Sequence, residues 1–464
     1  MAEEQEQEKV SSKVIALFVV VLLVAALGNL SQTAVNAMLS YVAEDLGVDL
    51  STGQLLATVY MMVMGVSVFL VGYLSERLTL FGYVALASTS FLVGSLLSLV
   101  APNFAVMLLG RVLQGFSAGI SVTVMQTIAM VKFPRSKSAT AMGFAGIAMG
   151  FSPNIGPVIG GAMVDTLGWR SFFLLLSVLA VVLLVAGMLL IERGGQTNPL
   201  VKFDAGSFIL VCIGFGGLLL GLSEASNNSL SDPLVWVLLL EGAVFMTVFL
   251  VVQHRKANPL VNLAIFKSRH YRRGTFLLCL LQASFMGVTL VIPLWWMDLC
   301  GGTAFEAGLV LLPGTITALV FNPVAGILTD KVGVRPVVLT FAAFLAVGAC
   351  GMVFLNAESS LAEAMFWQCL RQVGVSGLMS PLISWSFSGL GPSIMNSGTS
   401  FSMALRQAFS SFGTACMVII VLLVSPVNLE LAFHASFGFS AVLSVLLFII
   451  SVVYVRVYDK RIVE

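Results

Sequence analysis

The chain has 464 residues, of which 58% are hydrophobic and only 10% are charged. Soluble domains contain about 25% charged residues, so this composition excludes an ordinary water-soluble protein. The formal net charge of +1 gives no general attraction to nucleic acid. We therefore expect an integral membrane protein.

Apolar segments of the roughly 20 residues that a membrane-spanning helix needs recur along the whole chain. Fourteen spans are predicted, at residues 14–39, 52–75, 81–101, 104–131, 138–163, 170–191, 205–224, 233–253, 273–298, 304–328, 336–356, 361–388, 395–424 and 431–455. Segments of this kind satisfy their backbone hydrogen bonds internally, as lipid requires. The predicted fold class is an all-α membrane protein.

Charged residues separate between the two sides of these spans. Acidic residues dominate the loops after odd-numbered spans, where Arg170 is the only lysine or arginine. The loops after even-numbered spans collect the basic residues, as in the segment from Lys132 to Lys137. Because positively charged loops remain in the cytoplasm, we expect both termini to be cytoplasmic.

Two similar loops indicate an internal repeat. GYLSERLTLF starts at Gly72 and GILTDKVGVR starts at Gly326, and each places a carboxylate and a cation at the end of a span. The pattern predicts two six-helix halves with two additional helices between them. The expected parts are a cytoplasmic tail at 1–13, a bundle at 14–191, two helices within 192–253, a cytoplasmic linker at 254–272, a bundle at 273–455 and a tail at 456–464.

The fifth span is unusually rich in helix-breaking residues. Glycine costs a soluble helix about 1 kcal/mol and proline about 3 kcal/mol, but neighbouring membrane helices can satisfy the freed backbone groups. At helical spacing, one stripe contains Gly146, Gly150, Pro153, Asn154, Pro157 and Gly161. We predict that another helix approaches this stripe closely, either in simple packing or as the bendable seam of a moving gate.

Five motifs occur in order along the chain. They are GRVLQG from Gly110, GPVIGG from Gly156, AFEAGLVLLPG from Ala304, GILTDKVGVR from Gly326 and ALRQAFSSFGTA from Ala404. This set resembles the major facilitator superfamily, and within it the fourteen-helix branch of drug:proton antiporters. The resemblance covers essentially the whole chain and implies transport driven by a proton gradient, without a cofactor and without enzymatic activity. It also implies an antiporter or gating motif at Gly156, Pro157, Gly160 and Gly161.

The two loop copies are candidates for a conformational latch, in which a carboxylate engages in one state and releases in the other. The alternative is a solvated turn that only follows the distribution of positive charge. The first copy departs from the family pattern, with Glu76 in place of aspartate and Thr79 in place of glycine. The latch candidates are Gly72, Glu76, Arg77, Gly326, Asp330, Lys331 and Arg335.

Three arginines lie inside predicted spans, where a charge costs at least about 2.5 kcal/mol. By resemblance Arg111 has a role in proton coupling; the alternative is a structural cap on a neighbouring helix. Gln114 shares its helix face. For Arg371 and Arg406, lining of a substrate cavity and capping of helix ends both remain open.

The acid that this branch usually carries in its first span is missing, because the sequence reads Ser31-Gln32-Thr33-Ala34-Val35-Asn36. Two other acids near membrane depth are candidates for proton coupling. Glu241 lies in the additional helices, where a structural hydrogen bond is the stronger expectation. Asp298 at the end of the ninth span is the better titration candidate, with an exposed loop acid as the alternative.

Polar side chains inside spans are candidates for the substrate cavity, because lipid would leave their amides without partners. They are Gln32, Asn36, Gln114, Gln126, Gln282 and Gln368. Aromatic residues and methionines could line the same adaptable cavity, or face lipid or the core. These are Phe116, Met61, Met62, Met64, Met125, Phe401, Trp295 and Trp296, the two tryptophans being candidates for an interfacial belt as well.

The sequence predicts a secondary active exporter in the inner or plasma membrane, working by alternating access on amphipathic drugs or toxic metabolites. Its expected partners are a small-molecule substrate, protons and the lipid bilayer, and the expected state is a monomer that binds no nucleic acid. A first alternative is export of an anionic or neutral metabolite; a membrane enzyme or a sensor is a further one. The six cysteines are scattered and predict neither a metal site nor disulfides.

Overall fold

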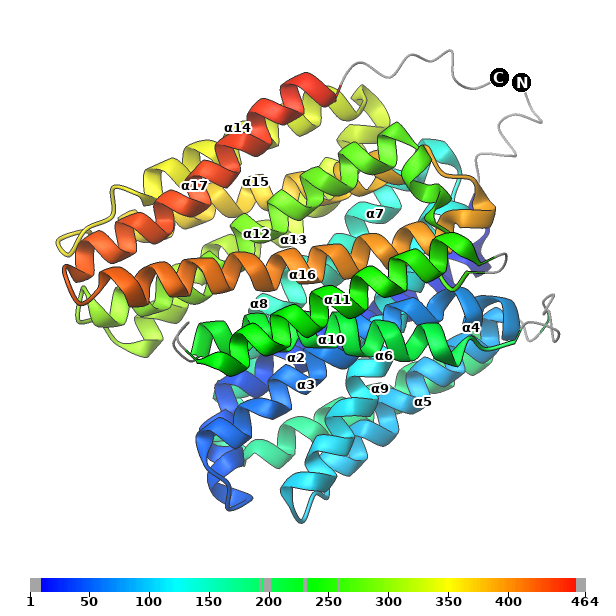
Figure 1. The fold of residues 1–464 in the computed structure, drawn as a ribbon, viewed down its shortest axis with the longest axis horizontal. Helices are drawn as coiled ribbons and strands as arrows, with labels where there is room; N and C mark the ends of the chain where they lie inside the picture. Colours follow the sequence, from blue (N-terminus) through cyan, green and yellow to red (C-terminus); the bar gives the residue numbers. More distant parts are fainter. Residues whose placement is uncertain (1–9, 192–193, 195–201, 228–231, 257–258, 456–464) are drawn as a thin grey trace.

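The computed structural model describes residues 10–191, 194, 202–227, 232–256 and 259–455, and the regular structure in these ranges is helical (Figure 1). The N-terminal half contains α2 (Ser12–Asp45), α3 (Leu50–Ser67), η1 (Val68–Leu70), α4 (Val71–Arg77), α5 (Leu80–Leu99), α6 (Phe104–Val131), η2 (Arg135–Lys137), α7 (Ser138–Gly146), η3 (Ile147–Phe151), α8 (Ser152–Leu167) and α9 (Trp169–Leu190). The additional pair is α10 (Ala205–Asn227) and α11 (Pro233–Arg255). The C-terminal half contains η4 (Leu263–Lys267), α12 (Arg269–Asp298), α13 (Ala304–Val332), α14 (Val334–Met352), α15 (Leu361–Phe387), α16 (Pro392–Val424) and α17 (Leu429–Tyr454).

Local sequence explains where many of these helices begin and end. The side chains of Asp49, Thr79 and Asn103 accept hydrogen bonds from the first turns of α3, α5 and α6. Gly168 and Gly333 have positive φ angles of 79° and 91°, which glycine adopts without strain. They allow the tight turns from α8 to α9 and from α13 to α14.

Twelve helices in the described part of the chain are long and apolar enough to cross a membrane, and a bent pair makes thirteen. The all-α membrane fold is therefore confirmed, whereas the count of fourteen and the cytoplasmic location of the termini stay predictions. The expected twelfth span forms α15, which lies outside that set. Glu363, Gln368, Arg371 and Gln372 lower its hydropathy.

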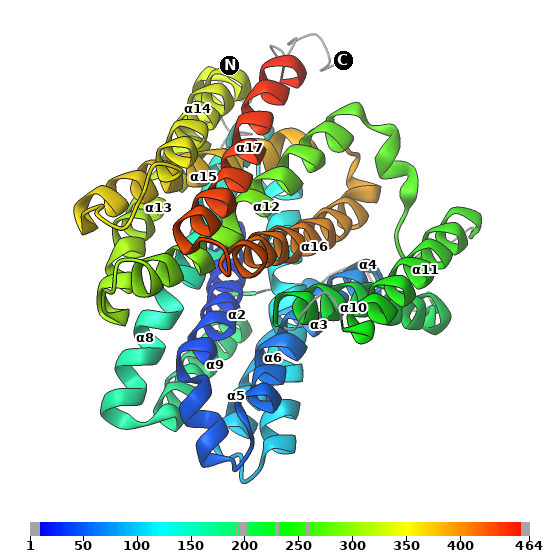
Figure 2. The ribbon, with the colours of Figure 1, turned by 60° about the vertical axis from the view of Figure 1, so that its left-hand side comes forward.

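The two halves meet at one side of the molecule and diverge toward the other, as both views show (Figures 1 and 2). We call the side where α2 begins and α17 ends the terminal face, and the opposite side the far face. At the terminal face Arg273 of α12 lies 4.8 Å from the ring of Tyr454 at the end of α17. In the additional pair, α10 packs against α3 of one half and α16 of the other, and α11 packs against α10.

The apolar core is also shared between the halves at one side and separate at the other. One large cluster contains residues of both halves, among them Met125 and Phe401. Two smaller clusters are confined to one half each, around Phe172 in the N-terminal half and around Trp295 in the C-terminal half. The halves therefore share a core near the terminal face and keep separate cores toward the far face.

Candidate functional site

The end of α13 contacts the start of α7 at the terminal face. The Asp330 carboxylate accepts hydrogen bonds from the backbone N–H groups of Ala139 and Thr140, at 3.2 and 2.7 Å, and from the Thr140 hydroxyl at 2.6 Å. A negative charge at a helix N-terminus is stabilised by the unpaired N–H groups and the helix dipole. The Ser380 hydroxyl of α15 donates to the Ala139 carbonyl at 2.6 Å. The second loop copy therefore joins the two halves.

Small residues allow the backbones to touch along this seam. A Cβ atom on Gly326 would collide with the carbonyl oxygen of Ala139, and one on Gly143 would lie 2.6 Å from the carbonyl oxygen of Asn322. The buried Asn322 amide lies against Gly146 of the other half. Asn322 is not among the residues predicted above, although a lone amide beside Pro323 in an apolar span is a usable signal. Lys331 is exposed and Arg335 is half-buried.

The first loop copy makes a different contact. Glu76 and Arg77 are exposed, and Glu76 has no hydrogen bond or ion pair within the described residues. Asn396 of α16 instead donates to the Ser75 hydroxyl at 2.7 Å. Gly72 approaches the carbonyl oxygen of Leu260 in the linker. The predicted engagement of Glu76 is therefore absent from this arrangement, because its side chain points to the exposed end of α4.

The fifth span is not the single straight helix on which the predicted stripe was built. A π-turn, η3, interrupts it, and its two segments, 138–151 and 155–164, are bent by 41°. Gly143 and Gly146 face α13, but Gly156 and Gly160 face α2, where a Cβ atom on Gly160 would lie 2.7 Å from the Ala34 carbonyl oxygen.

Of the predicted stripe, Gly146 and Gly150 lie against the Asn322 amide of α13, so the predicted close approach of another helix holds at these two positions. Gly161 has open space where a Cβ would lie, and Pro157 is exposed. The side chains of Pro153 and Asn154 lie outside the described part of the structure. The antiporter motif packs within the N-terminal half through Gly156 and Gly160.

Arg111 lies in a fully buried polar network. Its Nη1 donates to the Ser31 hydroxyl at 2.8 Å and to Gln114 Oε1 at 2.9 Å, and its Nε donates to the Leu56 carbonyl at 3.2 Å. The guanidinium carbon lies 4.0 Å from the centre of the Tyr60 ring, at cation–π distance. Neutral groups from α2, α3 and α6 therefore surround the charge, and Ser31 stands where the family's first-span acid is expected.

The two arginines of the C-terminal half are also buried, but they have fewer partners. Arg371 Nε donates to Gln368 Oε1 at 3.0 Å, and both terminal nitrogens lack a partner in the described structure. Arg406 Nη2 donates to the Met403 sulfur at 3.3 Å, and its Nε and Nη1 lack partners there. Neither guanidinium donates a hydrogen bond to a backbone carbonyl in the described ranges.

The remaining cavity candidates are dispersed. Gln126 is buried and donates to the Met149 sulfur at 3.4 Å, Gln282 has a buried Oε1 without a described partner, Gln32 is half-buried and Asn36 is exposed. Of the apolar candidates, Met64, Met125 and Phe401 belong to the shared core, whereas Phe116, Met61 and Met62 are half-buried.

The two tryptophans lie in the core, which is one of the surroundings that the sequence left open for them. Trp295 is fully buried and Trp296 is 8% exposed, both in the C-terminal core near the far face. Trp296 Nε1 donates to Glu306 at 3.3 Å. Neither forms an interfacial belt or an open cavity wall, because α13 and α17 cover them.

The two acids predicted near membrane depth are both exposed. Glu241 lies on the outer surface of α11 without a hydrogen bond in the described structure, so the predicted structural hydrogen bond is wrong. Asp298 is the last residue of α12, as the exposed-acid alternative expects. Within the described residues, every buried charged side chain is an arginine.

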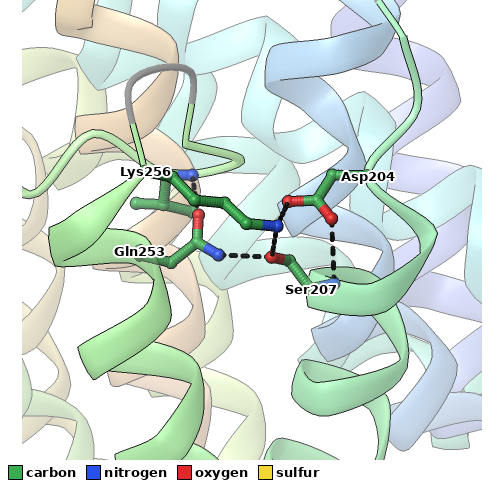
Figure 3. Close-up of polar contacts among 5 residues, drawn as sticks. Asp204, Ser207, Gln253 and Lys256 are labelled. Atoms are coloured by element: carbon green, nitrogen blue, oxygen red, sulfur yellow. Dashed lines mark hydrogen bonds and ion pairs between the residues drawn. The ribbon is translucent and has the colours of Figure 1, made fainter.

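A polar cluster fixes the additional helices at the terminal face (Figure 3). Lys256 contacts Asp204 at 2.5 Å, and Gln253 donates to the Ser207 hydroxyl at 2.7 Å while accepting from Val261 N–H at 3.2 Å. Burial alone would raise the pKa of Asp204, but hydrogen bonds from Lys256 and Ser207 outweigh it and lower that pKa. The cluster ties the linker to α10 and α11.

Known proteins share both the sequence and the fold. A family model described as Major Facilitator Superfamily matches residues 21–414. The chain belongs to the major facilitator superfamily. It is 30% identical to the uncharacterized MFS-type transporter YhcA of Bacillus subtilis, over 89% of this chain and 78% of that protein. It is also 30% identical to the lincomycin resistance protein LmrB of Bacillus subtilis, over 88% and 86% respectively.

A solved structure of the proton:xylose symporter XylE matches with a TM-score of 0.66 at 14% identity, covering 97% of each chain. At this identity the likeness concerns the fold alone. The chain is thus a multi-pass membrane transporter of this superfamily, and the resemblance deduced from its motifs is confirmed.

Proposed function

We propose that this protein is a secondary active exporter of amphipathic compounds that works by alternating access in the plasma membrane. The observation that carries the proposal is the seam at the terminal face, where Asp330 binds the start of α7 while the halves diverge toward the far face. A carrier with a cytoplasmic terminal face would be open to the outside in this state. The 30% identity to a lincomycin resistance protein supports amphipathic drugs as cargo.

The energy source in this proposal is the proton gradient, and no resident cofactor is needed. Arg111 is the coupling candidate that fits best, because it is wholly buried and held by neutral groups that respond to helix movement. Asp298 and Glu241 are accessible carboxylates that could exchange protons with their surroundings. The transporter is proposed to act as a monomer in the lipid bilayer.

Reconstituted vesicles with an imposed pH gradient test this function. Lincomycin and a cationic dye should move against their concentration gradients only while the pH gradient lasts. The Asp330→Asn variant should transport more slowly, because it loses the charge at the α7 terminus. Transport that is indifferent to the pH gradient would contradict proton coupling, and no transport of any amphipathic probe would contradict export itself.

A second candidate keeps the fold and changes the cargo to an anionic or neutral metabolite. It is favoured by the charge of the interior, since the buried ionisable cations of the described structure face no buried carboxylate that could bind a cationic drug. Parallel export of cationic dyes and organic anions from the same vesicles separates the two candidates.

A further inference from the structure

The interior of the described structure has an excess of positive charge. Arg111, Arg371 and Arg406 are 0%, 0% and 1% exposed, and among the described residues no buried aspartate or glutamate accompanies them. An uncompensated charge at membrane depth costs several kcal/mol. The three arginines differ in how far neutral groups offset this cost.

Arg371 has the geometry of a carboxylate receptor. Its Nε is engaged by Gln368 at 3.0 Å, which orients the planar guanidinium, whereas Nη1 and Nη2 both lack partners. Two parallel N–H groups of this kind match the two oxygens of a carboxylate, sulfonate or phosphate. Arg111 has only one orphaned nitrogen, and Arg406 has its Nη2 engaged by sulfur.

The surroundings of Arg371 hold it firmly and provide an apolar wall. A Cβ atom on Gly348 of α14 would lie 2.5 Å from the Arg371 backbone nitrogen, so α14 and α15 are in backbone contact there. The guanidinium carbon lies 5.7 Å from the centre of the Phe285 ring on α12. Arg371 therefore sits among α12, α14 and α15, inside the C-terminal half.

Arg406 adds a second positive charge beside the same helix. Arg406 is buried on α16, which packs along α12. In a medium of low dielectric constant, a second buried cation adds to the attraction of an anion at Arg371.

We propose that Arg371 binds the anionic head group of the transported compound, an amphipathic organic carboxylate, sulfonate or phosphate. Phe285 contacts the apolar body beside the head group, and Arg406 strengthens the attraction without the bidentate contact. This inference rests on the proposed transport function and specifies its substrate class.

A binding experiment on the detergent-purified full chain tests the proposal without any gradient. The probes are dansyl-leucine, which carries a carboxylate, and dansyl-leucinamide, which has the same fluorophore without the charge. The wild type should bind the carboxylate about tenfold more tightly, the factor expected from one charge-assisted hydrogen bond. Arg371→Gln should reduce the preference for the carboxylate probe to about twofold or less. Arg371→Lys should retain part of this preference, because lysine keeps the charge but lacks the two parallel N–H groups of the guanidinium.

Arg170→Gln is the matched control, because Arg170 is an exposed arginine paired with Asp45 at 2.6 Å. It should leave the preference unchanged. An unchanged preference in Arg371→Gln, or equal affinities of the wild type for both probes, overturns the proposal. If Arg371→Gln does not fold, Arg371→Lys decides: full retention of the preference overturns the bidentate contact, and partial loss supports it.

The same proteins in vesicles separate this inference from the transport function. If the wild type exports lincomycin but shows no preference for the carboxylate probe, the anion site is overturned and the proposed export function is still supported. Carboxylate-selective binding without export of any probe would support the site and contradict the transport proposal.

Discussion

The charged groups that have hydrogen-bond partners lie in different places in the two halves of the transporter. They lie in the interior of the N-terminal half and at the loop of the C-terminal half. In the N-terminal half the buried Arg111 donates to Ser31, Gln114 and Leu56, while Glu76 in the loop is exposed. In the C-terminal half the loop carboxylate of Asp330 caps α7, while each buried arginine has two nitrogens without a partner in the described structure, against one for Arg111. Sequence repeats therefore do not imply equivalent roles.

The comparison has a physical basis in the cost of buried polar groups. An engaged cation has already offset its desolvation with neutral hydrogen bonds, and removing it leaves several acceptors without donors. An unengaged cation still carries the cost, so its replacement by an apolar residue can be neutral or stabilising. Arg111 and Arg371 should therefore respond differently to the same substitution.

The largest expected effect is at Arg111. Arg111→Met should reduce export to background and lower the unfolding free energy by about 2 kcal/mol, since the Ser31, Gln114 and Leu56 groups lose their donor. Arg371→Met should melt at the wild-type temperature or above it. Melting curves in detergent and export from vesicles measure both, and equal destabilisation of the two variants would remove the contrast between the halves.

Gly156→Leu tests the close contact between α8 and α2 inside the N-terminal half. A side chain there would collide with Thr33 and with the Leu30 carbonyl of α2, so we expect a loss of about 3 kcal/mol and at least a tenfold fall in export. Gly161→Leu is the matched control, because open space surrounds that position. Normal export by the Gly156 variant would show that α8 does not need its close approach to α2.

Asp330→Asn tests the asymmetry of the loops. Loss of a charge at a helix N-terminus costs about 1–2 kcal/mol in a partly buried geometry, which shifts a two-state equilibrium roughly 5–30-fold. The rate at which a thiol reagent labels cysteines from the terminal face should increase by that factor. Glu76→Gln should leave labelling unchanged in this state, and an equal response of both variants would argue that the two copies act symmetrically.

The smallest effect concerns the additional helices, which belong to neither half. The folded-state pKa of Asp204 is lowered, so its stabilisation is present above the unfolded pKa of about 3.9 and is lost as the pH falls through the folded value. Asp204→Asn should cost at most about 1 kcal/mol at neutral pH. Melting curves of the variant and the wild type should converge in acid; a constant difference across pH would assign the effect to packing.

Much of the site was accessible to prediction because charged and helix-breaking residues are rare in an apolar chain. Arg111, Gln114 and Asp330 stand out for that reason, and the structure brings the first two together and places the third at the seam. Asn322 was missed although it is, like Gln126 and Gln282, a single amide inside an apolar span. For Trp295 the sequence left core, cavity and interface open, because an aromatic residue has the same sequence signature in all three.

The sequence by itself determined the membrane environment, the helical class and the superfamily, because hydropathy, glycine-rich motifs and charge are local properties that survive without contacts. Tertiary structure alone decided which partner each residue has. On the two sides of the π-turn at 147–151 the glycines of one span contact two different helices, and the neighbours of α6 and α15 leave one nitrogen of Arg111 but two of Arg371 without a partner in the described structure. Those outcomes depend on the rotation and approach of helices far apart in the chain, which no local pattern specifies.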